Sequence, residues 1–367
     1  MRTFSLKPIQ CSTRMSPLSA HVAHIGHLAR PAALEQLLAD RHEVLRKPAR
    51  RLAADVAPFL EQALHFHEVA CRADVRVRPV LQYYAYLNFA VAVVLIYKPP
   101  GWEQYRKHGA EDLSRTLKKL SLSSPIVQMR PGAVPLFHSV ISSAPASTSR
   151  LTLRDLLVQI PMVALELNQT FGIRPLAARV TTGLQESGEA PNQRIVAYCH
   201  LNLIDPANAP TWSPGNATLP TKRFQRAIPE LGSRFRVVEK QPHLVRLEST
   251  QHWTPGNRDR AERFLEETTF KACNFGGQQV NNNLSVEFMW RFERSSQILP
   301  TLTAALLLSF CLASLSRYRA NVVNRVDSSK INLLCEVFAS EADGFMIPAF
   351  RNLLYAETMY VHASTYT

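Results

Sequence analysis

The chain has 367 residues, of which 46% are hydrophobic, and this is enough for an extensive core and for two or three structural units. Its six cysteines are far apart and form no CxxC pair, which argues against a zinc ribbon or a redox motif and favours a reducing cytoplasm. The 42 Lys and Arg residues outnumber the 29 Asp and Glu residues, giving a formal net charge of +13. Such an excess favours contact with nucleic acid or an acidic partner, although it also serves to keep a large surface soluble.

The first 31 residues are basic and contain several serines. No Asp or Glu precedes Glu35, and a composition of this kind is typical of a transit peptide. We nevertheless expect residues 1–31 to form a loosely ordered basic tail. His21, His24 and His27 would share one face if this segment were helical, as in a metal site. Because no acidic or cysteine partner lies nearby, the sequence predicts no metal there.

Helical periodicity dominates residues 32–180, which we expect to form the N-terminal part of a helical main body. Between residues 32 and 73 apolar residues recur at spacings of three and four, and Pro48 and Pro58 predict two or three helices instead of one. A nearly uncharged helical segment, Val80–Tyr97, is followed by Lys98-Pro-Pro-Gly, which stops it. Residues 151–171 predict another helix, with a kink or break at Pro161.

Two apolar segments, Val80–Tyr97 and Leu299–Leu315, approach the length needed to cross a bilayer of roughly 30 Å. Gln82 and Asn88 lie inside the first segment, where unsatisfied amides are costly, and its tyrosines do not form belts at two ends. A helix that is apolar on all sides is also what the centre of a large helical domain requires. We therefore expect buried core helices and no membrane contact.

Residues 181–295 change in character, and we expect them to form a small β-rich insertion. Alternating apolar residues predict half-buried strands at residues 194–204 and 284–293, and a hairpin at residues 235–239 and 244–248. Asn257 is positioned to cap a helix that runs to Lys271.

Residues 296–367 return to helical periodicity. Leu299–Leu315 is followed by two shorter apolar helices, at residues 331–338 and 345–359. The predicted fold class is therefore α-rich (α+β), with a helical main body formed by both ends of the chain and the β-rich insertion between them.

Several catalytic motifs are absent from the sequence. GxxxxGK[ST], GxGxxG, GxSxG and HExxH do not occur, and no lysine follows an Asp or Glu by two positions, as a restriction-type nuclease site requires. Helical ribonucleases of the HEPN type are similar in size and need an Arg followed by a His one to two turns on. Arg351-Asn352 begins in this way, but Ala356 and Glu357 stand where the His would fall. The pairs with suitable spacing lie in expected strands: Arg194/His200 and Arg246/His252.

The strongest candidate for a ligand-binding site is a set of polar residues near the tyrosine-rich start of Val80–Tyr97: Tyr84, Asn88, His108, Arg317 and Arg319. Tyr84 and Asn88 are four apart and would share one helical face. A buried Asn88 needs partners, which Arg317 or backbone groups would supply. The arginines suit an anionic ligand such as a nucleotide or phosphate. Alternatively, the same residues form a structural network between two central helices.

The sequence also leads to predictions for two histidines and for a set of basic residues. On one helix, His65 and His67 flank Phe66 and face different ways, so we expect His65 to pack toward the core and His67 to remain solvated. The candidates for nucleic-acid contact are clustered basic residues: Arg46, Lys47, Arg50, Arg51, Lys222 and Arg223.

Several stretches resemble the YaaC-like family of bacterial proteins. These are Arg78-Pro-Val-Leu-Gln-Tyr-Tyr-Ala-Tyr-Leu-Asn-Phe-Ala, Lys107-His-Gly and Ser316-Arg-Tyr-Arg-Ala-Asn-Val-Val, together with Glu61-Gln-Ala-Leu-His-Phe-His-Glu-Val-Ala and Lys330-Ile-Asn-Leu-Leu-Cys-Glu-Val-Phe. The resemblance covers residues 35–125 and 298–360 and fades in the β-rich middle. It implies a mostly helical, cytoplasmic protein, and it implies no particular reaction.

The sequence therefore predicts a cytoplasmic binding or adaptor protein whose basic surface contacts nucleic acid or an acidic partner, in bacterial defence or stress response. Two alternatives stay open: a metal-independent, HEPN-like ribonuclease, and a sensor of an anionic metabolite or nucleotide. No catalytic constellation, cofactor or metal site is predicted, and the sequence is compatible with an oligomer.

Overall fold

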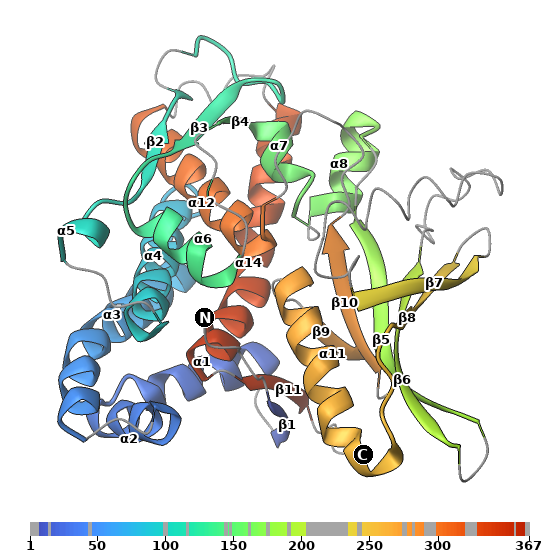
Figure 1. The fold of residues 1–367 in the computed structure, drawn as a ribbon. Coiled ribbons are helices and arrows are strands. Elements are labelled where there is room, and N and C mark those ends of the chain that lie inside the picture. Colours follow the sequence, from blue (N-terminus) through green and yellow to red (C-terminus); the bar gives the residue numbers. More distant parts are fainter. Residues whose placement is uncertain are drawn as a thin grey trace.

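The computed structural model of the protein describes residues 7–13, 16–42, 46–97, 102–114, 117–142, 146, 149–160, 163–173, 177–188, 192–202, 234–240, 244–273, 277–280, 283–289, 299–319, 329–355 and 357–363. They form a helical body built from both ends of the chain and a six-stranded antiparallel sheet built from its middle (Figure 1). The expected α-rich α+β fold class is confirmed.

The helical body contains six main helices: α1 (Pro17–Leu28), α2 (Pro31–His42), α3 (Arg46–Arg72), α4 (Arg78–Tyr97), α12 (Thr301–Tyr318) and α14 (Ser329–Tyr355). Shorter helices are α5 (Trp102–Tyr105), α6 (Ala133–Ile141), α7 (Leu153–Leu157) and α8 (Ala164–Phe171). A three-stranded antiparallel sheet lies beside them, with the order β2 (Ala110–Asp112), β3 (Pro125–Met129), β4 (Arg150–Thr152).

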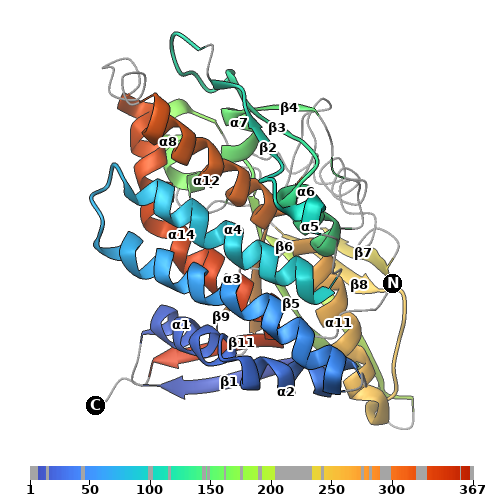
Figure 2. The ribbon, with the colours of Figure 1, turned by 90° about the vertical axis from the view of Figure 1, so that its left-hand side faces the viewer.

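Helix α4 is the centre of the body. It packs against α3, α6, α12 and α14 and lies between α3 and α12 (Figure 2). By length and composition, Arg78–Tyr97 and Thr301–Tyr318 are apolar enough to cross a membrane, and 78% of the most apolar window of each is buried inside the structure. Burial of this extent among other helices is the environment that an all-round apolar helix requires.

The proline positions do not interrupt the helices as expected. Residues 32–73 do form two helices, but α2 ends at His42 and α3 continues without a break through Pro58. Pro48 stands in the first turn of α3, where its missing N–H has no intrahelical partner to lose. In the same way α14 is one helix that includes Pro348, and the expected separation into helices at residues 331–338 and 345–359 is wrong.

The described part of the N-terminal segment forms a strand and a helix. Ser16 caps α1 by accepting a hydrogen bond from the Ser19 backbone N–H at 3.2 Å, and Ile25 and Leu28 are buried against the body. Strand β1 (Lys7–Thr13) pairs in parallel with β11 (Glu357–Ala363). The buried residues of α1 and this long-range pairing connect the described part of the segment to the helical body. The expected helix at residues 345–359 therefore ends early, because β11 begins at Glu357.

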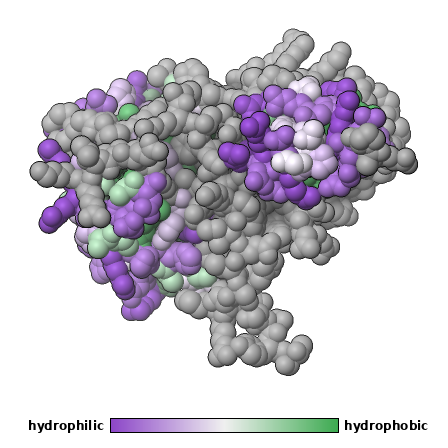
Figure 3. Space-filling model, turned by 60° about the horizontal axis from the view of Figure 1, so that its bottom comes forward, coloured by the Kyte–Doolittle hydropathy of each residue, from purple (hydrophilic) through white to green (hydrophobic). Residues whose placement is uncertain are grey.

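The middle of the chain forms the six-stranded sheet. Its order is β7 (Phe235–Lys240), β8 (Leu244–Ser249), β6 (Arg194–Asn202), β5 (Ala177–Ser187), β10 (Asn283–Met289), β9 (Gly277–Val280). The predicted strands and the hairpin β7–β8 are confirmed. Helix α11 (Arg258–Cys273) packs against β5, β6 and β10. On the face shown in Figure 3, hydrophilic side chains dominate the described residues, with smaller apolar areas between them.

Candidate functional site

Three residues of the expected ligand-binding set, Tyr84, His108 and Arg317, lie together near the start of α4. Arg317 Nη1 donates a hydrogen bond to the Tyr84 hydroxyl at 3.1 Å. The His108 ring stands edge-on to the Tyr84 ring, with centroids 5.9 Å apart and an interplanar angle of 83°. The guanidinium carbon of Arg317 lies 4.9 Å from the ring centre of the neighbouring Tyr318. We refer to Tyr84, His108 and Arg317 as the Arg317 cluster.

A close backbone crossing places His108 beside Tyr84. The Val134 N–H, at the start of α6, donates to the His108 carbonyl at 3.0 Å. Just beyond His108, Gly109 has a φ of 81° and lies directly against Gly132, which precedes α6. Only residues without a Cβ allow this approach, so the two glycines fix the position of His108.

The other two members of the expected set do not join the cluster. Asn88 donates from Nδ2 to the Tyr84 carbonyl at 2.8 Å, within its own helix, whereas Arg317 bonds to the Tyr84 hydroxyl. Arg319 Nη2 instead donates to the Leu117 carbonyl, in the connection between β2 and β3. Asn88 is therefore satisfied locally, and Arg319 fastens the end of α12 to the neighbouring loop.

Burial and charge both act on the His108 imidazole. Burial lowers its pKa, and the nearby positive charge of Arg317 lowers it further. At neutral pH the ring is therefore uncharged, and Arg317 provides the positive charge of the cluster.

Replacing Arg317 with alanine should raise the pKa of His108, because the substitution removes a positive charge that disfavours the imidazolium. An NMR titration of the His108 ring protons measures this directly. Arg72→Ala is the matched control, since Arg72 is exposed and pairs with Glu68 at 2.9 Å. A His108 pKa that is the same in wild type and Arg317→Ala would contradict the electrostatic contact.

The expected nucleic-acid contacts are only partly placed. Arg50 and Arg51 are exposed near the start of α3. Arg46 and Lys47 begin that helix, but their side chains lie outside the described residues, as do Lys222 and Arg223 altogether. Phe66 of α3 stacks on Tyr84 with centroids 5.5 Å apart. Arg50 precedes Phe66 by sixteen residues, which corresponds to about 24 Å along the helix, so these arginines do not form one compact site with the Arg317 cluster.

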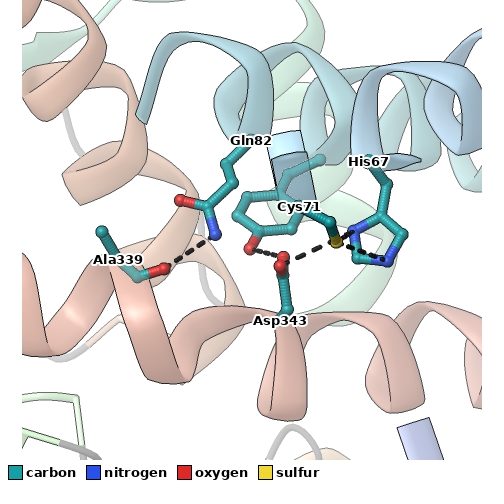
Figure 4. A network of polar contacts seen from close by, with 6 residues as sticks. His67, Cys71, Gln82, Ala339 and Asp343 are labelled. Carbon is teal, nitrogen blue, oxygen red and sulfur yellow. Dashed lines mark hydrogen bonds and ion pairs between the residues drawn. The ribbon is translucent and has the colours of Figure 1, made fainter. Parts of the chain in front are cut away.

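A second polar group, not predicted as a site, lies between α3, α4 and α14 (Figure 4). Asp343 of α14 accepts a hydrogen bond from the Tyr86 hydroxyl and lies 3.6 Å from His67 Nδ1. Cys71 Sγ lies 3.9 Å from His67 Nδ1 and 3.7 Å from its Nε2. Gln82 Nε2 donates to the Ala339 carbonyl at 2.8 Å, one turn before Asp343.

The electrostatics of this second group follow from burial and its contacts. Burial acts to raise the pKa of Asp343, but the contacts with His67 and Tyr86 outweigh it and lower that pKa. Burial, together with the Asp343 charge, raises the pKa of the Cys71 thiol.

The expectation for the histidines was wrong, because His67 is buried and His65 is exposed. The spacing of His67 and Cys71, four apart on one helix, was the available signal, but their partner Asp343 is distant in sequence.

His21 and Arg351, which the sequence also singled out, are both buried in the helical body. His21 is only 5% exposed, and burial, with Arg351 and His24 adding to it, lowers its pKa to about 4. Arg351 is 1% exposed, and its guanidinium carbon lies 4.4 Å from the ring centre of Tyr355. The start of the HEPN-like motif therefore lies inside the core.

Comparison with known proteins identifies the family. No curated protein and no solved structure matches the chain. The family model for YaaC-like Protein matches residues 28–333. This match runs through the β-rich middle, where the sequence resemblance fades, and it ends before residue 360. It includes the whole Arg317 cluster, whereas Asp343 follows it. Because the match covers most of the sequence, the chain belongs to the YaaC-like family.

Proposed function

We propose that the protein is a cytoplasmic binding or adaptor protein that contacts nucleic acid through its basic surface, with the Arg317 cluster as a principal contact. The observation that carries the proposal is the exposure and positioning of the Arg317 guanidinium. Its side chain is exposed, the Tyr84 hydroxyl positions it, and no carboxylate among the described residues pairs with it. A positioned guanidinium without an acidic partner is suited to a phosphate.

The aromatic neighbour of Arg317 favours nucleic acid over a simple anion. Tyr318 is 58% exposed and lies against the Arg317 guanidinium. Exposed aromatic rings stack on bases, while arginine contacts the backbone, which is the usual combination for binding single strands. The net charge of +13 provides the long-range attraction.

The distance between the Arg317 cluster and the exposed Arg50 and Arg51 is compatible with an extended ligand. A distance of about 24 Å along α3 is several times the length of one nucleotide, so only a ligand of several nucleotides spans it. A nucleic acid of this length that contacts the Arg317 cluster is long enough to reach the start of α3, whereas a mononucleotide occupies only one end. An acidic protein and a nucleotide metabolite are the competing ligands, and the binding experiment below distinguishes them.

The ribonuclease alternative has less support. Asn352 is 8% exposed and Arg351 is 1% exposed, so the pair that begins the HEPN-like motif does not face a substrate. An RNase assay on the purified protein tests this alternative. Activity that is lost in both His108→Ala and Arg317→Ala would favour a ribonuclease centred on the Arg317 cluster.

The proposal predicts salt-sensitive binding of labelled single-stranded RNA and DNA. Titrations across a series of salt concentrations should give a linear loss of log affinity with log salt, because phosphate contacts release counterions. Arg317→Ala should weaken binding about tenfold and reduce the slope by roughly one contact, whereas Arg72→Ala should change little. Thermal shifts with mononucleotides test the metabolite alternative in parallel.

The outcomes separate the roles of Arg317. A folded Arg317→Ala variant with weakened binding supports the proposal, while global unfolding of that variant supports a structural network between α4 and α12. No affinity at low salt, or an affinity that does not depend on salt, would refute nucleic-acid binding.

A further inference from the structure

The polar group around Asp343 lies on the other side of α4 from the Arg317 cluster. Tyr84 and Tyr86 are two residues apart on α4, so they project to different sides of the helix, toward α12 and α14 respectively. His67, Cys71 and Asp343 offer a nitrogen, a sulfur and a carboxylate oxygen that all lie within 4.8 Å of one another. From this arrangement we propose that His67, Cys71 and Asp343 bind a divalent transition-metal ion, with Zn²⁺ the best suited.

The separation of His67 and Asp343 leaves room for an ion between them. His67 Nδ1 and Asp343 Oδ2 are 3.6 Å apart, longer than the about 2.7–3.2 Å of an N–H···O hydrogen bond. Tetrahedral Zn²⁺, with bonds of about 2.0–2.3 Å, separates its nitrogen and oxygen ligands by about 3.4 Å and its nitrogen and sulfur ligands by about 3.6 Å. The nitrogen–oxygen separation is therefore already close to that of zinc ligands. Cys71 Sγ lies 3.9 Å from His67 Nδ1 and 3.7 Å from Nε2, so the sulfur would have to turn toward Nδ1 to complete the set.

Both the donor types and their placement suit zinc. Thiolate, imidazole and carboxylate are the three ligand types that Zn²⁺ takes in proteins, and the thiolate makes Mg²⁺ or Ca²⁺ unsuitable. His67 and Cys71 are four apart on α3 and so share one face of a rigid helix. Asp343 comes from α14, so an ion here would join helices from the two ends of the chain.

The surroundings of Asp343 resemble the outer shell of a metal site. The Tyr86 hydroxyl bonds to Oδ1, which leaves Oδ2 on the side of His67. Hydrogen bonds of this kind orient metal-ligating carboxylates. Cys71 is exposed, which gives an ion access from solvent and leaves a fourth position for water.

Cobalt binding provides a direct test, because Co²⁺ occupies zinc sites and reports its ligands by absorption. The purified full-length protein, stripped of metal with a chelator and titrated with Co²⁺, should bind one ion per chain. It should show visible bands of tetrahedral Co²⁺ and a near-ultraviolet thiolate-to-cobalt band, and Zn²⁺ should displace both. In parallel, Zn²⁺ should raise the thermal midpoint of the wild type.

Three variants decide the assignment. Cys71→Ser should abolish the thiolate band, and His67→Gln should weaken Co²⁺ binding at least tenfold. His65→Gln, an exposed histidine two residues away on α3, should bind like the wild type. Since Cys71 is exposed, its substitution should leave the circular dichroism spectrum unchanged. Absence of stoichiometric binding in the wild type, a thiolate band that persists in Cys71→Ser, or equal loss in His65→Gln would overturn the proposal.

Discussion

Replacing Gly132 with alanine should destabilise the protein by roughly 4 kcal/mol, the largest loss that we expect from any glycine substitution among the described residues. A Cβ at this position would lie 2.5 Å from the Gly109 nitrogen and 2.6 Å from the Lys107 carbonyl oxygen. Both are backbone atoms, so no side-chain rotation relieves the clash. Chemical denaturation monitored by circular dichroism measures the loss.

The substitution should also act on the Arg317 cluster. The backbone next to Gly132 carries the hydrogen bond from Val134 to the His108 carbonyl, so a displaced crossing moves His108 away from Tyr84. Gly344→Ala is the control, because a Cβ there meets no atom within 4 Å and the helix gains about 1 kcal/mol of propensity. Equal stabilities for Gly132→Ala and the wild type would show that the crossing does not form.

Replacing Phe350 with alanine should destabilise the protein by about 4 kcal/mol, since a fully buried ring is lost and a cavity remains. Phe350 of α14 is 0% exposed. Its ring centroid lies 5.4 Å from that of Phe89 in α4 and 5.6 Å from that of Phe137 in α6. The substitution therefore removes an aromatic contact between the C-terminal helix and the N-terminal helices.

The matched control for Phe350→Ala is Leu333→Ala on the same helix. Leu333 is 47% exposed, so its truncation should cost less than about 1 kcal/mol. Urea unfolding of both variants compares them under one condition. If Phe350→Ala cost no more than Leu333→Ala, α14 would not be packed against α4 as the structure shows.

The central elements were predictable because their patterns are local. Val80–Tyr97 is apolar on every side and bounded by prolines, and the observed helix runs from Arg78 to Tyr97. Alternating residues in the middle of the chain likewise predicted strands β6 and β10. In both cases the hydrophobic period and the flanking breakers agree, so neighbouring residues alone determine the element.

The elements that were missed depend on distant partners or on context. Strand β1 pairs with β11 from the other end of the chain, and the sheet β2–β3–β4 consists of short strands with little periodicity of their own. Pro58 was expected to end a helix, but α3 continues past it. Its neighbours Val56, Ala57 and Leu60 are buried, and this packing offsets the lost hydrogen bond.

The polar residues of α4 show the same limit at the candidate sites. Tyr84 and Asn88 were expected to share one helical face, with Arg317 as a partner of Asn88, and the structure brings Tyr84 and Arg317 together. The amide of Asn88 bonds within its own helix instead. Gln82 and Tyr86 point toward α14 instead, and no sequence pattern connects them with Asp343. Which face of an all-apolar helix meets which neighbour is decided by tertiary packing.

Ultraviolet cross-linking of bound single-stranded RNA, followed by mass spectrometry of the cross-linked peptides, tests the proposed binding function most directly. We predict that nucleotides attach to the peptides that contain Tyr84 or Tyr318, and that these attachments are lost in Arg317→Ala but kept in Arg72→Ala. Cross-links confined to other parts of the chain, or attachments to Tyr318 that do not depend on Arg317, would contradict the role proposed for the Arg317 cluster.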